Sequence, residues 1–130
     1  MYVSDVQTHR IQKFTKDGDF VLGWGTLGSG PGEINGPGRP CVLANGNVVV
    51  PDQGNSRMQV FTNNGAFLFA WGSPGTGPGQ FNHPTCVACD AAGSTYYVMD
   101  KDNARVQKFG GITTDVKAGT WGAIKRRYRR

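Results

Sequence analysis

The sequence predicts an all-β fold made of about three imperfect copies of one four-stranded unit. Short β-rich runs alternate with Asp-Gly, Asn-Gly and Gly-Pro turn signals, and no ten-residue stretch has the apolar periodicity of a helix. The same residue pattern also recurs along the chain at spacings of 47 and then 48 residues. Together these observations indicate repeated antiparallel sheets.

Each copy contains an apolar run that ends in aspartate and is followed five residues later by arginine. The pairs are Asp5 and Arg10, Asp52 and Arg57, and Asp100 and Arg105. An aromatic segment then ends in Trp24, Trp71 or Trp121, with two residues inserted in the last copy. An active site is needed once, whereas a loop-closing charged contact is needed in every copy, so we interpret the pairs as structural. The tryptophans are expected to fill the space between neighbouring units.

The central copy predicts strands over about residues 41–44, 47–50, 58–62 and 66–71. Asn45-Gly46 and Asn64-Gly65 predict two-residue hairpin turns in which both residues have positive φ. A Gly-Pro-Gly link is duplicated at residues 28–33 and 75–81, and Pro40 and Pro84 are aligned as the leaders of the next strand. The first copy begins in its second strand, so we expect its inner strand to be missing.

The repeated pattern resembles the NHL repeat, a unit of β-propellers. Residues 52–61 and 79–84 match its Asp-to-Phe strand motif and its Pro-led entrance. The resemblance implies a partial propeller over residues 1–123, with blades at about 2–25, 40–72 and 84–122, followed by a basic tail at 124–130. Because propellers close with about four to eight blades, other sequence of a longer protein, a partner or further copies of the chain must complete the ring. Two copies would give roughly six blades, and an isolated chain should expose apolar faces.

The net charge of +5 comes from the tail, which holds five of the 14 basic residues, while the remaining nine balance the nine acids. A nucleic-acid footprint over the whole domain is therefore not indicated. The tail could bind RNA phosphates and stack a base on its tyrosine, or it could be a solvated end. The resemblance adds an RNA-binding alternative, because NHL proteins related to tripartite-motif ubiquitin ligases bind RNA or proteins on a propeller face. The candidate residues are Lys125, Arg126, Arg127, Tyr128, Arg129 and Arg130.

An enzymatic alternative follows from the resemblance to peptide amidating lyases, which use a three-histidine zinc site. The chain has two histidines, His9 and His83, so one copy cannot build that site and we expect no metal, cofactor or catalytic residue. The Gly-Pro-Gly links are followed by strands, unlike phosphate-binding loops. We therefore predict a non-catalytic scaffold that binds a protein partner.

Three cysteines, an odd number without dense spacing, favour a reducing compartment such as the cytoplasm. Cys86 and Cys89 form a CxxC, but residues three apart on a strand point to opposite faces, so we expect small core residues. No apolar run approaches the roughly 20 residues that span a bilayer, and Met1 to Asp5 show no signal-peptide pattern. No membrane partner is expected.

Overall fold

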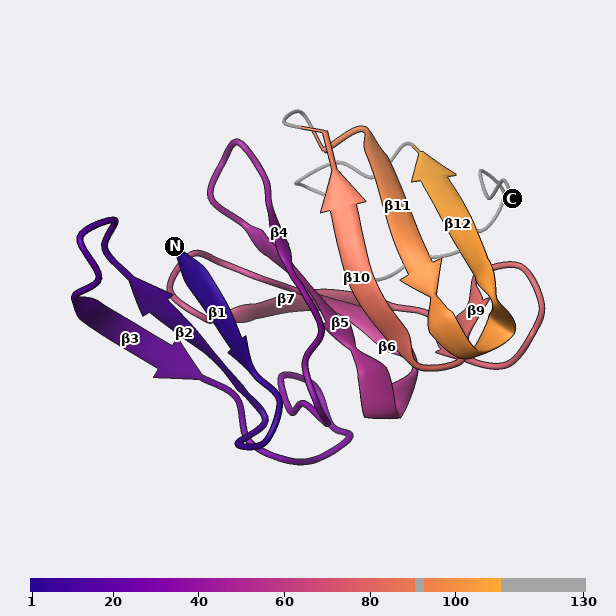
Figure 1. Ribbon diagram of the computed structural model, residues 1–130, viewed down its shortest axis with the longest axis horizontal. Coiled ribbons are helices and arrows are strands. Elements are labelled where there is room, and N and C mark those ends of the chain that lie inside the picture. Colours follow the sequence, from indigo (N-terminus) through magenta and orange to yellow (C-terminus); the bar gives the residue numbers. More distant parts are fainter. Residues whose placement is uncertain (91–92, 111–130) are drawn as a thin grey trace.

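A computed structural model describes residues 1–90 and 93–110, and the structural statements below concern these residues. They form three antiparallel sheets that follow one another along the long axis of the molecule (Figure 1). No α-helix occurs in this part of the chain, and the predicted all-β class is confirmed. None of the short helical turns found in these residues has the length and hydropathy needed to cross a bilayer.

The strands are short and joined mainly by tight turns. The N-terminal sheet contains β1 (Tyr2–Asp5), β2 (Arg10–Phe14) and β3 (Phe20–Trp24). The central sheet contains β4 (Cys41–Val42), β5 (Val48–Asp52), β6 (Arg57–Phe61) and β7 (Phe67–Trp71). The C-terminal sheet contains β10 (Pro84–Cys89), β11 (Thr95–Asp100) and β12 (Arg105–Gly110). A parallel pair, β8 (Ser73–Pro74) and β9 (Gln80–Phe81), lies between β7 and β10 in the chain. Two short 3-10 helices, η1 (Gln53–Asn55) and η2 (Lys101–Asn103), precede β6 and β12.

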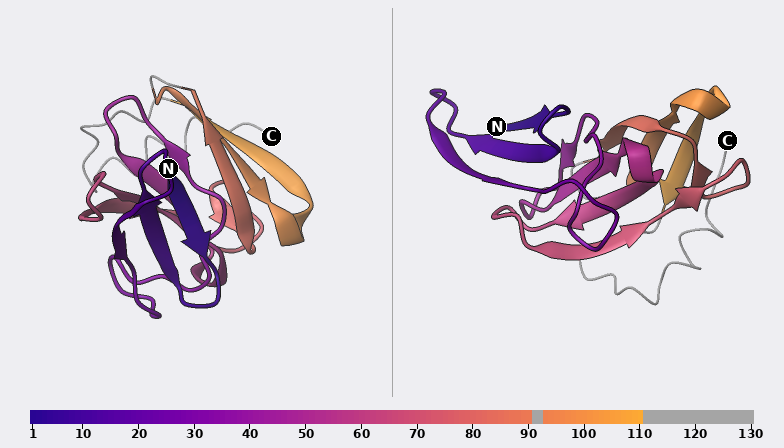
Figure 2. Two further views of the ribbon diagram at one scale, coloured as in Figure 1. Left: turned by 60° about the vertical axis from the view of Figure 1, so that its left-hand side comes forward. Right: turned by 90° about the horizontal axis from the view of Figure 1, so that it is seen from below.

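The central sheet is buried on both faces because a neighbouring sheet lies on each side of it. Successive side chains of one strand therefore alternate between two cores. Val48 and Val50 pack with Ile11 and Ile34 on the side of the N-terminal sheet. Val49, between them, joins the core shared with the C-terminal sheet. Figure 2 shows the N-terminal and C-terminal sheets on opposite sides of the central one. The alternation explains why all five residues of β5 are buried, as in a strand that is covered twice.

The hairpin turns differ from the expected type. In the two turns predicted from Asn-Gly pairs, Gly46 and Gly65 have positive φ, at 92° and 88°, whereas Asn45 and Asn64 do not. Gly46 N donates to Leu43 O at 2.9 Å and Gly65 N to Thr62 O at 3.0 Å. These are type I turns followed by a left-handed glycine, the usual three-residue loop, so the prediction of two-residue turns was wrong. β4 ends at Val42, before this turn.

Gly65 and Gly18 offer a matched test of crowding between sheets. Both have φ near 90°, but a Cβ on Gly65 would lie 2.6 Å from Trp24 Cδ2, whereas one on Gly18 meets nothing within 4 Å. Each Gly→Ala change should cost about 1–2 kcal/mol of unfolding free energy from backbone strain. Gly65→Ala should cost about 1–3 kcal/mol more, because the added methyl overpacks the Trp24 ring. Urea denaturation followed by tryptophan fluorescence measures both, and equal losses would contradict the crowding argument.

The residue that leads the inner strand of the central sheet is Pro37 and not Pro40. Pro37 lies opposite Asp52 in an isolated bridge, just as Pro84 lies opposite Asp100. The alignment of Pro40 with Pro84 was therefore wrong by three residues, because the sequence cannot reveal which of two nearby prolines pairs with the second strand. With this register Arg39 is equivalent to Cys86, and these two residues pair in parallel across the boundary between the sheets.

Candidate functional site

The Asp52 cluster consists of Asp52, Asn55, Arg57 and Gln59, at the end of the central sheet where β5 turns into β6. Asp52 is fully buried, and its Oδ2 accepts from Arg57 Nε at 2.8 Å, Asn55 Nδ2 at 2.9 Å and Gln59 Nε2 at 3.0 Å. Its Oδ1 accepts from the backbone N of Asn35 at 2.8 Å. One carboxylate thus gathers three side chains and one backbone amide, which compensates its loss of water.

The Asp52 cluster holds the first linker, residues 28–35, which joins the N-terminal sheet to the central one. Arg57 Nη2 donates to the carbonyls of Gly30 and Glu33, both at 2.9 Å, and Nη1 donates to that of Ser29 at 3.1 Å. Gln59 donates to Glu33 O at 2.6 Å and accepts from Gly32 N at 3.0 Å. A linker with little secondary structure therefore has its backbone polar groups satisfied by side chains of the sheet that follows it.

The Asp100 cluster repeats this arrangement with Asp100, Asn103, Arg105 and Gln107. Arg105 Nε lies 2.8 Å from the buried Asp100 Oδ2, and its Nη atoms donate to three carbonyls of the second linker, residues 75–82. Asn103 and Gln107 donate to the same carboxylate oxygen at 2.9 and 3.0 Å. Every contact has its counterpart in the Asp52 cluster, 47 or 48 residues earlier. The sequence pattern indicated the charged pairs, but not that the arginines also bind the linkers.

The Asp5 cluster of the N-terminal sheet, Asp5, Arg10 and Gln12, has the same residues in an open state. Arg10 Nε is 3.9 Å from Asp5 Oδ2, and the side chains are 49% and 32% exposed, against 16% and 0% for Arg57 and Asp52. With the Gln12 amide assigned the orientation that satisfies its hydrogen-bonding groups, its oxygen accepts from Arg10 Nε and Nη2 at 3.0 and 2.8 Å. Hydrogen bonds from Thr8, which stands where the other copies have asparagine, hold the pKa of Asp5 below its usual value. No linker lies on this cluster among residues 1–90 and 93–110.

The tryptophans lie where neighbouring sheets meet. The Trp24 ring is 5.6 Å from that of Phe61 in the central sheet, and the Trp71 ring is 6.1 Å from that of Phe109, the equivalent residue of the C-terminal sheet. Trp71 also meets Tyr96 edge to face at 5.7 Å. Such pairs add to the stabilisation from buried area. Trp121 and the tail residues 124–130, with their predicted RNA contacts, lie outside the described residues.

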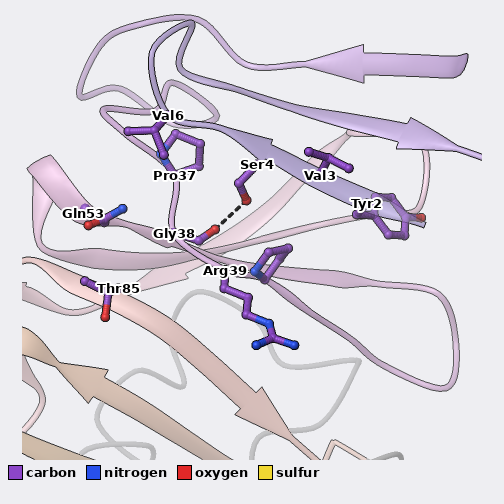
Figure 3. Close-up of a pocket in the computed structure, with 10 residues that line it drawn as sticks. Tyr2, Val3, Ser4, Val6, Pro37, Gly38, Arg39, Gln53 and Thr85 are labelled. Atoms are coloured by element: carbon purple, nitrogen blue, oxygen red, sulfur yellow. Dashed lines mark hydrogen bonds between the residues drawn. The ribbon is translucent and has the colours of Figure 1, made fainter.

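A groove of about 430 Å³ lies between β1 and the segment that leads into β4 (Figure 3). One wall consists of Tyr2, Val3, Ser4 and Val6, and the other is formed by residues 37–40. Ser4 Oγ donates across it to Gly38 O at 2.5 Å. β1 pairs with β2 along one edge, and its other edge faces this groove.

The cysteines come from two sheets. Cys41 of β4 lies beside Cys89 of β10, whose Sγ donates to Val42 O at 4.0 Å. Burial, the largest cause, raises the pKa of the Cys41 thiol well above its usual value. Burial also raises the pKa of Cys89. Both side chains pack against the core shared by the central and C-terminal sheets, so they serve as packing groups. The contact was not foreseen, because nothing in the sequence brings residues 41 and 89 together.

The two histidines lie in different turns. His9 Nδ1 accepts from Gly36 N at 3.0 Å, and His83 Nδ1 is 2.7 Å from Asp102 Oδ2. Within the described ranges no three histidine, cysteine, aspartate or glutamate side chains are grouped as ligands of a metal ion.

Fold and site thus define a broad class: an all-β protein of repeated antiparallel sheets, two of which hold the linker that precedes them through a buried carboxylate cluster. No protein-family model matches the sequence, and no curated protein is significantly similar to it.

Proposed function

We propose that residues 1–123 are part of a β-propeller of NHL type, with the three sheets as blades, and that the chain is a non-catalytic scaffold that binds a protein partner. The observation that carries the proposal is the duplicated linker-binding cluster. Two clusters with the same contacts, 47 to 48 residues apart, are what a repeat architecture requires. The same interaction would be redundant in an enzyme with one active site.

The accessibility of the charged groups supports a non-catalytic role. Asp52 and Asp100 are fully buried, and the arginines beside them donate to linker carbonyls. A substrate could reach these carboxylates only after the linker had left. General acid–base catalysis requires a group within hydrogen-bond reach of the reacting atoms, so the clusters are better suited to holding the fold together.

Exposed apolar side chains at both ends support association with a protein. Tyr97 and Val106 of the C-terminal sheet are 45% and 49% exposed, whereas their equivalents in the central sheet, Val49 and Met58, are fully buried against the next sheet. Val3 of the N-terminal sheet is 43% exposed, and its equivalents Val50 and Val98 are fully buried. In the part of the chain that the structure describes, both faces are open to water, and such faces are typical of interaction sites.

The mass of the chain in solution tests this proposal. Multi-angle light scattering on the full chain should give a mass of at least twice the 14.0 kDa of one copy, because association would cover the apolar faces. Tyr97→Lys with Val106→Lys, two exposed positions, should reduce the association. A stable, well-folded monomer at all accessible concentrations would contradict the proposal.

A further inference from the structure

Among residues 1–90 and 93–110, the N-terminal sheet contains an unfilled copy of a binding site, and two filled copies of that site occur in the other two sheets. Each filled site takes one continuous segment of the chain. Residues 75–82 lie on the Asp100 cluster, and β10, directly after them, pairs with the edge of β11 in the same sheet. Residues 28–35 lie on the Asp52 cluster in the same way, and residues 37–42 then pair with β5.

The corresponding surfaces of the N-terminal sheet are open. The guanidinium of Arg10 binds no linker carbonyl in the described part of the chain and turns to Gln12 instead. The edge of β1 that faces away from β2 has no strand on it among these residues. It is equivalent to the edges of β5 and β11 that pair with β4 and β10. Both surfaces belong to one sheet, so a single extended segment could occupy both.

The groove beside β1 has the walls that such a segment needs. β10 lies between β11 of its own sheet and residue 39 of the neighbouring one, with Arg39 N donating to Thr85 O at 2.9 Å. The groove likewise lies between β1 and residues 37–40 (Figure 3). The carbonyl of Gly38, which is equivalent to that of Thr85, now accepts from Ser4 Oγ. A strand in the groove could donate to this carbonyl in place of the serine.

We propose that the N-terminal sheet binds in trans a partner segment with the chemistry of residues 75–89. Its Gly-Xaa-Gly-Pro-Gly-Gln turn would present three carbonyls to Arg10 and Gln12, and its Pro-led strand would add to the free edge of β1. This mode is β-strand addition with a charged side chain as an anchor. The inference rests on the proposed function and names the chemistry of the partner segment.

The direct test uses a fluorescent peptide with the sequence of residues 75–89 and the full chain under reducing conditions. Fluorescence anisotropy should show saturable binding that weakens roughly tenfold or more with Arg10→Ala, because charge-assisted hydrogen bonds to carbonyls are lost. Lys16→Ala, which removes an exposed charge in the turn between β2 and β3, should leave the affinity unchanged. Arg10 is half exposed, so its replacement should not prevent folding.

A second variant lies in the peptide and leaves the chain intact. Gly79 has φ of 77°, and its N–H donates to Gln107 Oε1 at 3.1 Å. A peptide with Gly79→Val cannot readily adopt this turn and should bind at least roughly tenfold more weakly, since left-handed backbone is strained for a branched residue. Equal binding of both peptides, no binding at all, or no effect of Arg10→Ala would each overturn the inference.

The mass measurement separates this inference from the proposed function. If the free chain associates but does not bind the peptide, the proposed site is wrong. The scaffold proposal then stands, since the copies associate through another face. If the chain is a monomer that ignores the peptide, both fail. If excess peptide dissociates the associated chain, the site is supported, and the copies then associate through the same surface of the N-terminal sheet.

Discussion

Asp52→Ala is expected to lower the unfolding free energy by about 3–5 kcal/mol, because it leaves a largely buried guanidinium and three further donors without the carboxylate that they share. The loss is a large share of the 5–15 kcal/mol typical of a domain. Urea denaturation followed by tryptophan fluorescence measures it. If the variant does not fold, Asp52→Asn, which keeps one acceptor oxygen, should give a smaller and measurable loss.

Asp5→Ala is the matched control for the Asp52 prediction. Asp5 is the same residue at the equivalent position, but its side chain is 32% exposed and lies 3.9 Å from its arginine. Exposed ion pairs contribute little to stability, so this change should leave the denaturation midpoint nearly unaltered. Similar losses at the two positions would mean that the filled cluster does not stabilise the fold through the linker.

Trp71→Ala is expected to cost about 3–5 kcal/mol of unfolding free energy, the range for removing a large aromatic residue from a core. Trp71 is buried between the central and C-terminal sheets, against Phe69, Tyr96 and Phe109. The variant should also loosen the boundary between these sheets. Chemical denaturation followed by circular dichroism gives the stability without relying on the lost fluorophore.

Two further variants make the Trp71 result specific. Trp71→Phe keeps most of the ring contacts and removes an indole N–H that is buried without a partner in the described part of the chain, so its loss should be smaller than that of alanine. Phe20→Ala removes an exposed aromatic ring and should change stability by no more than about 0.5 kcal/mol. If Trp71→Ala were as mild as Phe20→Ala, packing at the sheet boundary would not control stability.

The sequence predicted the all-β class and most strand positions of the central sheet to within one or two residues, because turn residues and alternating side chains are local signals. Local signals also explain the errors. Pro37 and Pro40 are both acceptable strand leaders, and only pairing with Asp52 distinguishes them. Four residues other than glycine have left-handed backbone, with φ from 51° to 58°, and residue type did not predict them: His9, Ser56, His83 and Ala104.

The site was only partly predictable. The spacing of aspartate and arginine indicated a contact within each copy, and in the central and C-terminal sheets Nε of the arginine makes that contact at 2.8 Å. The other guanidinium nitrogens donate to carbonyls 24 to 29 residues earlier in the chain. The sequence did not predict these contacts, because backbone carbonyls carry no residue-specific signal. The propeller arrangement itself stays a proposal.

Each linker follows one sheet in the chain and is held by side chains of the next sheet, and this arrangement affects how the molecule unfolds. Melting of the central sheet would release residues 28–35, which lead out of the N-terminal sheet and carry Ile34 in the core between the two sheets. Neighbouring sheets are thus coupled by polar contacts as well as by apolar packing, which raises the nearest-neighbour term that governs cooperativity in repeat proteins. Denaturation of the three sheets should therefore be a concerted transition and not a stepwise loss from the ends.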